Sequence, residues 1–254
     1  MSARVSALRA RAPEAEPLSI AESAAALSAE FETLPAEAIV ARAIDEFGGR
    51  IALVSSFGAE AAALLHVVAR IDRTTPVIFL DTGKHFAQTT AYREDLARAL
   101  GLTDVRDIRP LTEETAQADP KGDLWRRDND ACCALRKVRP LERALAGFDA
   151  WFTGRKRVHG ALRAFLPIVE AAPPHIKINP LARWTGEDVE TYAAKHALPA
   201  HPLVEQGFRS IGCWPCTAPI AVGDDPRAGR WRGLSKTECG IHRGAVTQRI
   251  AETA

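Results

Sequence analysis

The stretch IALVSSFGAEAAALLHVVARIDRTTPVIFLDTG, residues 51–83, decides the fold. It predicts a buried strand over residues 51–55, a helix over 59–70 and a second strand over 76–80. A polar turn follows each strand. Strands that alternate with helices form a parallel sheet, and such sheets bind ligands at the carboxyl ends of their strands. We therefore expect an α/β fold with a ligand site where the two turns meet.

The rest of the chain continues this alternation less regularly. Further strands are predicted over residues 105–108, 149–153 and 176–178, and further helices over 84–100 and 132–145. Another helix begins at Thr185, because Asp188 three residues later completes a variant of the capping box. These elements extend the expected parallel sheet.

The two turns carry side chains suited to a nucleotide. Ser55-Ser56-Phe57-Gly58-Ala59-Glu60 lies between a strand and a helix, where backbone N–H groups converge on an anion. It matches neither the P-loop nor the dinucleotide fingerprint, and many such turns carry Ser and Gly for geometry alone. Leu80-Asp81-Thr82-Gly83 ends the next strand at the same edge. Together the two turns favour a nucleotide-binding site.

Four of the five cysteines form two close pairs, Cys132-Cys133 and Cys213-Trp214-Pro215-Cys216. Four thiolates are what an iron–sulfur cluster or a structural zinc requires. Adjacent side chains on a helix diverge by roughly 100°, which favours a bulky cluster over one small zinc ion. Cys213 and Cys216 could instead form a redox dithiol, but that interpretation leaves Cys132 and Cys133 unexplained.

The fifth cysteine, Cys239, lies in Lys236-Thr237-Glu238-Cys239-Gly240-Ile241-His242. Neighbouring cations lower the pKa of a thiol and make it a better nucleophile, while a lone surface cysteine is the alternative. Lys137 lies one helical turn after Cys133, where a cation would stabilise thiolates or a bound anion. An ordinary surface lysine is the alternative there.

Composition excludes several functional classes. Hydrophobic residues make up 46% of the 254 residues, which is enough for a substantial core. The 33 Lys and Arg residues against 32 Asp and Glu predict no nucleic-acid partner. No apolar run approaches the roughly 18–20 residues that cross a membrane, and no signal peptide opens the chain. Five cysteines without a secretory signal indicate a reducing cytoplasm.

Local clusters of cations are more informative than the net charge. Arg227, Arg230 and Arg232 lie in an irregular stretch suited to holding a small anion. The run Arg155-Lys156-Arg157, taken by itself, is interpreted as a solvated surface.

These residues together resemble the sulfonucleotide reductases, and specifically the iron–sulfur branch, the assimilatory adenylyl-sulfate (APS) reductases. The matching pieces follow family order across residues 50–245: the turn over residues 55–60, Leu80-Asp81-Thr82-Gly83, Cys132-Cys133 with Arg136 and Lys137, Thr153-Gly154-Arg155, Cys213 to Cys216, Arg227 with Arg230, and Glu238-Cys239-Gly240-Ile241-His242. The cysteine pairs and the last motif are the most specific of these.

The resemblance implies an adenine-nucleotide α-hydrolase-like fold and reduction of APS to sulfite and AMP for cysteine biosynthesis. In the implied mechanism Cys239 attacks the sulfur, and thioredoxin or a glutaredoxin-like dithiol releases sulfite from the thiosulfonate. One 4Fe–4S cluster on Cys132, Cys133, Cys213 and Cys216 is implied to shape the local field without passing electrons to substrate. The residues implied to bind substrate are Ser55, Ser56, Gly58, Glu60, Leu80, Asp81, Thr82, Gly83, Lys137, Gly154, Arg163, Arg227, Arg230 and His242.

Three segments are expected. Residues 1–30 form an N-terminal extension with a flexible start, residues 31–220 form the α/β domain that binds nucleotide and cluster, and residues 221–254 form a loop-rich catalytic tail. The reductant is expected to be a separate protein, and a homo-oligomer is left open.

Three alternative functions remain at this point. The first is reduction of the 3′-phosphorylated substrate PAPS, or of both substrates. The second is an ATP pyrophosphatase-type adenylating enzyme of the same fold, which would use the turn at Ser56 but not Cys239. The third is a non-enzymatic iron–sulfur or zinc module, which would need neither turn.

Overall fold

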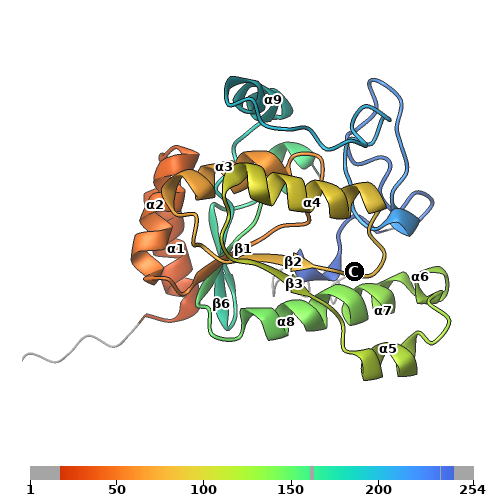
Figure 1. Cartoon of the computed structure of the whole chain (residues 1–254). Helices are drawn as coiled ribbons and strands as arrows, with labels where there is room; N and C mark the ends of the chain where they lie inside the picture. The colour runs from red at the N-terminus through yellow and green to blue at the C-terminus, as the bar shows by residue number, and fades with distance from the viewer. Residues whose placement is uncertain (1–17, 161–162, 235, 243–254) are drawn as a thin grey trace, which may run out of the picture.

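The computed structural model describes residues 18–160, 163–234 and 236–242. Its centre is a six-stranded sheet with the strand order β3-β2-β1-β4-β6-β5 (Figure 1). All neighbouring strands pair in parallel except β5, Val169–Ala172, which runs antiparallel to β6, His175–Ile178. The expected α/β fold with a parallel sheet is confirmed.

The first three strands follow the predicted strand–helix–strand pattern. β1 spans Ile51–Val54, β2 Val77–Leu80 and β3 Val105–Ile108. The connecting helices are α3, Ala61–Ile71, and α4, Ala87–Leu100. The chain then returns to the other side of β1 to form β4, Ala150–Phe152. The strand order therefore reverses between β1 and β4, and sheets of this kind bind ligands at such a switch point.

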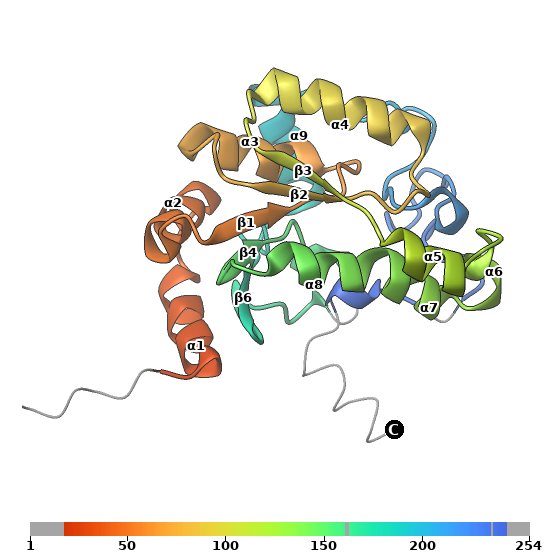
Figure 2. The same ribbon diagram turned by 60° about the horizontal axis from the view of Figure 1, so that its bottom comes forward.

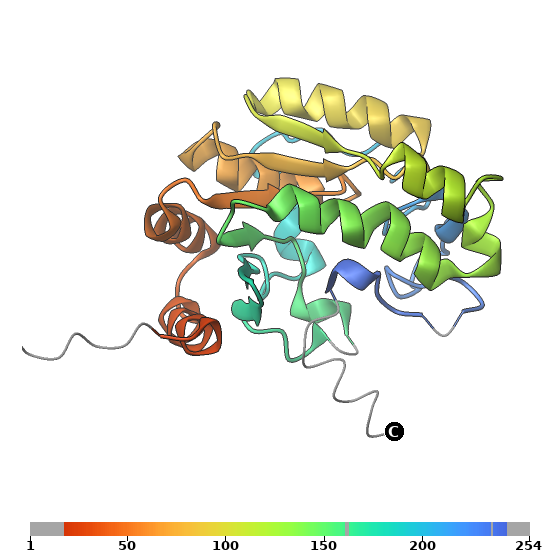
Figure 3. The same cartoon turned by 90° about the horizontal axis from the view of Figure 1, so that it is seen from below.

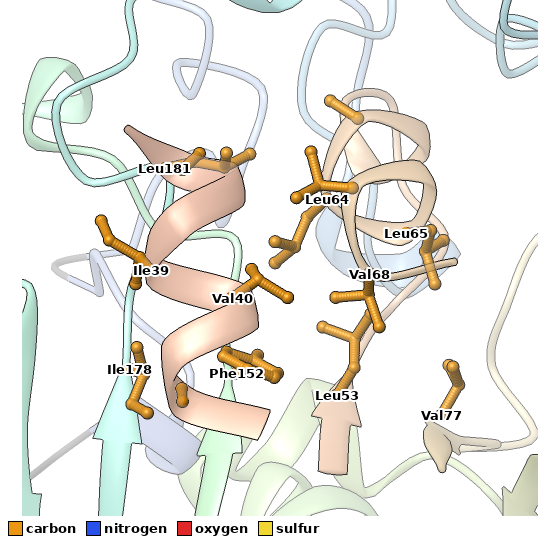
Figure 4. Close-up of a cluster of buried hydrophobic side chains, with 14 of the residues drawn as sticks. Ile39, Val40, Leu53, Leu64, Leu65, Val68, Val77, Phe152, Ile178 and Leu181 are labelled. Carbon is orange, nitrogen blue, oxygen red and sulfur yellow. The ribbon is translucent and has the colours of Figure 1, made fainter. Parts of the chain in front are cut away.

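Hydrophobic side chains on the two faces of the sheet form two separate cores. Leu53, Phe152 and Ile178 face one core, which also takes in buried residues of α2, Ala36–Phe47, and of α3 (Figure 4). Their strand neighbours Ala52 and Trp151 face the other core, against α8, Arg139–Leu145. Because successive strand residues point to opposite faces, both sides of the sheet are covered by helices, as Figure 2 shows.

The cysteine pair lies near the start of a nearly continuous helical segment. The helix α7 spans Asn129–Cys133, the π-helical turn η1 Ala134–Val138, and α8 follows directly. The expectation that Cys132 and Cys133 open this helix is wrong, because the Asp128 side chain caps it by accepting a hydrogen bond from Ala131 N at 2.8 Å. The pair therefore ends a short helix. Two other short helices, α5 Thr112–Ala118 and α6 Leu124–Arg127, precede it.

The described part of the N-terminal segment is ordered against the sheet. Helix α1, Ile20–Phe31, packs on the edge strand β5, and the Phe31 side chain is fully buried. Residues 1–17 of the expected extension lie outside the described residues. The helix α9, Gly186–Lys195, begins with the predicted capping box, in which Asp188 N donates to Thr185 Oγ1 at 3.1 Å. None of the helices over the described ranges is long and apolar enough to span a membrane.

The end of the described chain returns to the segment that carries the cysteine pair. The 3₁₀ turn η5, Gly240–His242, contacts η1. In Figure 3 this turn, drawn in blue, lies beside the green helical segment that includes α8. Cys239 is thereby brought next to residues more than 100 positions earlier in the sequence.

Candidate active site

A cavity of about 220 Å³ lies at the carboxyl ends of β1, β2 and β4. Its walls come from the turns that follow these strands, from the loop around residues 209–212, and from residues 227–242. Among the residues expected to bind substrate, those that line it are Ser55, Ser56, Gly58, Glu60, Leu80, Lys137, Gly154, Arg163, Arg227, Arg230 and His242, and Cys239 joins them.

The turn after β1 is held tightly against the core. Phe57 adopts a positive φ of 48° and buries its ring edge-on against Phe79. Phe57 N donates to Ser55 Oγ at 3.2 Å. A Cβ on Gly58 would lie 3.0 Å from the Ile211 carbonyl oxygen, so a larger residue would force the two backbone segments slightly apart. Ser55, Ser56 and Gly58 of this turn line the cavity, at the kind of position where a turn before a helix can bind a phosphate.

In the turn after β2, one residue lines the cavity and the next three make contacts that hold the turn in place. Leu80 lines the cavity, but Asp81, Thr82 and Gly83 lie outside its lining. Asp81 accepts hydrogen bonds from Gly83 N at 3.0 Å and from Arg109 Nε at 2.8 Å. The buried Thr82 hydroxyl lies 3.4 Å from Cys213 Sγ. These three residues stabilise the turn and the cysteine region.

The run Arg155-Lys156-Arg157 is not a solvated surface, and that interpretation was wrong. Arg155 and Lys156 are 7% and 1% exposed. Each cation meets a carboxylate from a distant part of the chain: Arg155 contacts Glu170, Lys156 Nζ lies 2.6 Å from Glu60 Oε2, and Arg157 Nη1 lies 2.8 Å from Glu32 Oε1. Ion pairing with these carboxylates offsets the desolvation cost of burying the cationic side chains.

The arginines Arg155, Arg163 and Arg227 line the cavity, and Lys177 is buried close to them. Burial and, to a smaller extent, the charge of nearby Arg163 together lower the pKa of Arg155 and of Arg227 to about 10. Burial and the charge of Arg155 together lower the pKa of Lys177 to about 7. Cations that lower one another's pKa leave an excess of positive potential, so this cationic part of the cavity is built to receive an anion.

Cys239 lies where this cationic part of the cavity meets the cysteine pair. It is 8% exposed and packs with Cys133 and Trp231. Burial would lower the pKa of Lys137, but the thiols of Cys213, Cys239 and Cys133 raise it above its usual value. Lys137 therefore carries its positive charge among the sulfur atoms. Lys137 is therefore the cation beside the thiols that the sequence predicted, and not an ordinary surface lysine.

His242, at the end of the turn that follows Cys239, lines the same cavity. Its ring stacks on Trp151 with 6.3 Å between the ring centroids and 10° between the planes. Burial, together with the positive charges of Arg155 and Lys177, holds the pKa of His242 well below its usual value. The imidazole is therefore neutral near pH 7 and can act as a hydrogen-bonding group beside an anion.

The other four cysteines line a second, smaller cavity. Cys132, Cys133, Cys213 and Cys216 surround it together with Lys137 and Trp231. Several donors reach the sulfur atoms: Asn129 Nδ2 donates to Cys216 at 3.2 Å and Lys236 Nζ to Cys133 at 3.3 Å. Over the described residues, no three Cys, His, Asp or Glu side chains converge tightly enough for one metal ion.

The donor set of this second cavity fits an iron–sulfur cluster. Burial and, to a smaller extent, the neighbouring Cys133 together raise the pKa of the Cys132 thiol to about 11. For Cys213, burial would raise the pKa, but Lys137 and the Thr82 hydroxyl lower it. Four thiols around one cavity, two of them buried, with cations and N–H donors close to them, match what thiolate ligands require.

Sequence reasoning missed several residues of the main cavity. Arg155, His159, Arg209 and Trp231 line it, and Lys177 lies buried nearby. Arg155 had a usable signal, because it directly follows Gly154 at the end of a strand on the ligand edge. Lys177 had none, since its partners Glu170 and Trp151 are set by tertiary packing.

The reversed strand order, the turn after β1 and the cationic cavity together define an α/β nucleotide-binding protein of the adenine-nucleotide α-hydrolase-like fold. The family described as phosphoadenosine phosphosulfate reductase domain matches residues 50–219, and the chain belongs to this family.

Individual relatives agree with this membership. The chain is 53% identical over 236 residues to a Mesorhizobium japonicum protein named adenosine 5′-phosphosulfate reductase, covering 92% of this chain and 93% of the relative. It is 41% identical over 221 residues to a Gloeobacter violaceus protein named phosphoadenosine 5′-phosphosulfate reductase, covering 85% and 92%. Among solved structures, phosphoadenylyl-sulfate reductase from Candida auris in its phosphate complex superposes with a TM-score of 0.66 at 27% identity, covering 79% of this chain and 99% of the other.

Proposed function

We propose that this chain reduces APS to sulfite and AMP in sulfate assimilation, with a thioredoxin-type dithiol as electron donor. The observation that carries the proposal is the position of Cys239, which lines the same cavity as the turn after β1 and the arginines. Relatives that carry the name adenosine 5′-phosphosulfate reductase at 53% and 43% identity support APS as the substrate.

The proposed reaction has two exchanges at sulfur. The Cys239 thiolate attacks the sulfur of the sulfate group, the bond to the phosphate oxygen breaks, and AMP leaves with the electron pair. Cys239 then carries a thiosulfonate. A thiolate of the dithiol attacks Cys239 Sγ and releases sulfite, and the second thiol of the dithiol resolves the mixed disulfide. The dithiol supplies both electrons and Cys239 returns to its starting state.

The cationic part of the cavity makes the first exchange feasible. A thiolate that approaches an anionic group is repelled, and preorganised cations offset that repulsion. Lys137, Arg163, Arg227 and Arg230 line the cavity together with Cys239. The neutral His242 adds a hydrogen-bonding group without adding repulsion or charge. We therefore assign these five side chains to binding the phosphosulfate group.

We propose that Cys132, Cys133, Cys213 and Cys216 hold one 4Fe–4S cluster. When bound, the cluster supplies a local electrostatic field beside the reaction site. Lys137 lies between the two cavities, since it lines both. Its position lets it balance the charge of the thiolates and of the substrate at once.

The expected division of the chain is kept as a proposal, with an α/β domain over residues 31–220 and a catalytic tail over 221–254. The tail contributes Arg227, Arg230 and Cys239 to the cavity. We also propose a cytoplasmic location, because a reducing compartment keeps the five free thiols reduced.

The direct test is anaerobic purification followed by an assay with APS and thioredoxin. Release of AMP and sulfite, together with about four irons per chain, is expected. Pyrophosphate release from ATP without APS turnover would support the adenylating alternative instead. A brown protein that turns over neither nucleotide would support a non-enzymatic cluster module.

We predict a preference for APS over PAPS of more than about tenfold in kcat/KM, because a 3′-phosphate requires additional cations around the ribose. The nearest candidates, Arg155, Lys156 and Arg157, already hold Glu170, Glu60 and Glu32. Initial rates with both substrates under the same thioredoxin concentration measure the ratio. Equal values would show dual specificity, and a higher value for PAPS would reverse the assignment.

A second prediction concerns the close contact beneath the Cys239 turn. A Cβ on Gly240 would lie 2.9 Å from Val138 Cγ2, so Gly240→Ala must displace the turn that carries the nucleophile. We expect kcat to fall by about 100-fold, because a displacement near 1 Å is enough for such a loss. Gly186→Ala is the matched control, since a Cβ there meets nothing within 4 Å. Unchanged kcat in Gly240→Ala would show that the turn is not held as described.

A further inference from the structure

The carboxylate of Glu238, the residue before Cys239, lies in the cavity on the arginines assigned to the substrate. Arg163 donates to it with two nitrogens, Nε to Oε1 and Nη2 to Oε2, the latter at 2.8 Å. Arg227 Nη2 lies 3.6 Å from Oε2. The Glu238 side chain is 16% exposed and lines the cavity. This two-pronged geometry is the one with which an arginine binds a phosphate or sulfate group.

The surrounding groups offer more donors than Glu238 can use. Over the described residues, buried nitrogens without a hydrogen-bond partner include the donors Arg155 Nε and Arg230 Nε, and also His242 Nδ1, which donates in one tautomer of the neutral ring. All three residues line the same cavity, and Arg155 is 7% exposed. Buried donors are seldom left unpaired in native proteins. An incoming group with more acceptor oxygens than one carboxylate would satisfy them.

The charge around Glu238 leads to the same conclusion. Burial would raise the pKa of Glu238, but Arg163 lowers it below its usual value, with contributions from Arg227 and Arg155. The carboxylate is therefore ionised near neutral pH. A phosphate or sulfate group on the same arginines would stand beside this negative charge, and like charges at such a distance repel strongly. The carboxylate and the anionic ligand cannot both use Arg163 in this way.

We propose that Glu238 is an internal competitor that occupies the arginine site in the free protein and must be displaced by the phosphate or sulfate group of the nucleotide. The inference rests on the proposed function, in that it takes a sulfonucleotide or its AMP product as the ligand. Displacement frees the neighbouring residue, Cys239, from the arginine anchor at the step where it meets the substrate. Glu238 thereby sets the affinity for the anionic part of the ligand and not for its base.

The test compares ligands with and without the anion in three proteins. Isothermal calorimetry measures the Kd of AMP and of adenosine for the wild-type holoprotein, Glu238→Gln and Glu32→Gln. Glu32→Gln is the matched control, because it removes a carboxylate that also pairs with an arginine, Arg157, and does not line the cavity. We expect Glu238→Gln to bind AMP at least about fivefold more tightly, with adenosine unchanged. Glu32→Gln should match the wild type for both ligands.

A glutamine could still accept a hydrogen bond from Arg163, so Glu238→Ala is measured in parallel and should also tighten AMP binding. Glu238→Asp, which keeps the charge, should remain closer to the wild type. AMP affinity that is unchanged or weaker in both Glu238→Gln and Glu238→Ala would overturn the proposal. Binding of AMP is scored separately from turnover, so a wild-type protein that binds AMP but does not reduce APS would count against the proposed function and leave this inference standing.

Discussion

Cys239→Ser is expected to abolish turnover of APS, with a loss on the order of 10⁴-fold or more, while the protein keeps its iron and its affinity for AMP. Cys239 is the nucleophile in the proposed reaction, and a serine hydroxyl neither ionises near neutral pH nor forms the thiosulfonate. The exchange of sulfur for oxygen changes the volume of a buried side chain very little. The surrounding cavity should therefore remain intact.

Mass spectrometry supplies the positive counterpart of this loss. Wild-type protein treated with APS in the absence of a dithiol should carry a sulfite-sized adduct on the peptide that contains Cys239. Addition of thioredoxin should remove the adduct and release sulfite. An adduct on Cys133 or Cys213 instead, or residual turnover in Cys239→Ser above about one percent, would rule out the assigned nucleophile.

The parts of the fold that were predicted correctly are those with local signals. β1 and β2 each combine an apolar run with a following turn, β3 continues the alternation of strands and helices, and a capping box at Thr185 marks the start of α9. The edge strand β5 was missed because Val169–Ala172 is short and half-buried, and only its antiparallel pairing with β6 makes it a strand. Such a segment is defined by its neighbours and not by its own periodicity.

The candidate site divides in the same way. The sequence predicted that the two cysteine pairs lie close together, because ligation of one shared group explains both pairs. The structure places all four cysteines around one cavity. The burial of Arg155, Lys156 and Arg157 could not be predicted, since their carboxylate partners lie 15, 96 and 125 residues away along the chain. Long-range pairing of charges leaves no pattern in a local stretch of sequence, so a buried cationic run is indistinguishable there from a solvated one.

Sequence spacing also gave an incomplete account of Lys137. Its position after Cys133 suggested one turn of α-helix, but the intervening segment is π-helical. The Lys137 ammonium interacts electrostatically with Cys213 and Cys239 as well as with Cys133. A π-helical turn at a functional site redirects the side chains that follow it. The sequence identified the right neighbour, and the structure adds two more.

Cys213→Ser is expected to remove the visible absorbance of the cluster and nearly all of its iron and sulfide, and with them the activity. Cys213 contributes one of four thiolates, and serine is a poor ligand for iron in such a cluster. Cys213 lies in a loop that begins the 3₁₀ turn η4, Trp214–Cys216, outside the cores of the sheet. The fold should therefore survive, and circular dichroism together with AMP binding would verify that it does.

Cys239→Ser provides the matched control for this experiment, because it replaces the one cysteine that does not line the smaller cavity. Both variants are purified anaerobically and assayed for iron, sulfide and zinc. Loss of iron in Cys213→Ser with full iron in Cys239→Ser is expected, since only the first removes a ligand. The reverse pattern would exchange the two roles. One zinc per wild-type chain and no iron would replace the cluster with a structural zinc site, because four thiolates bind either.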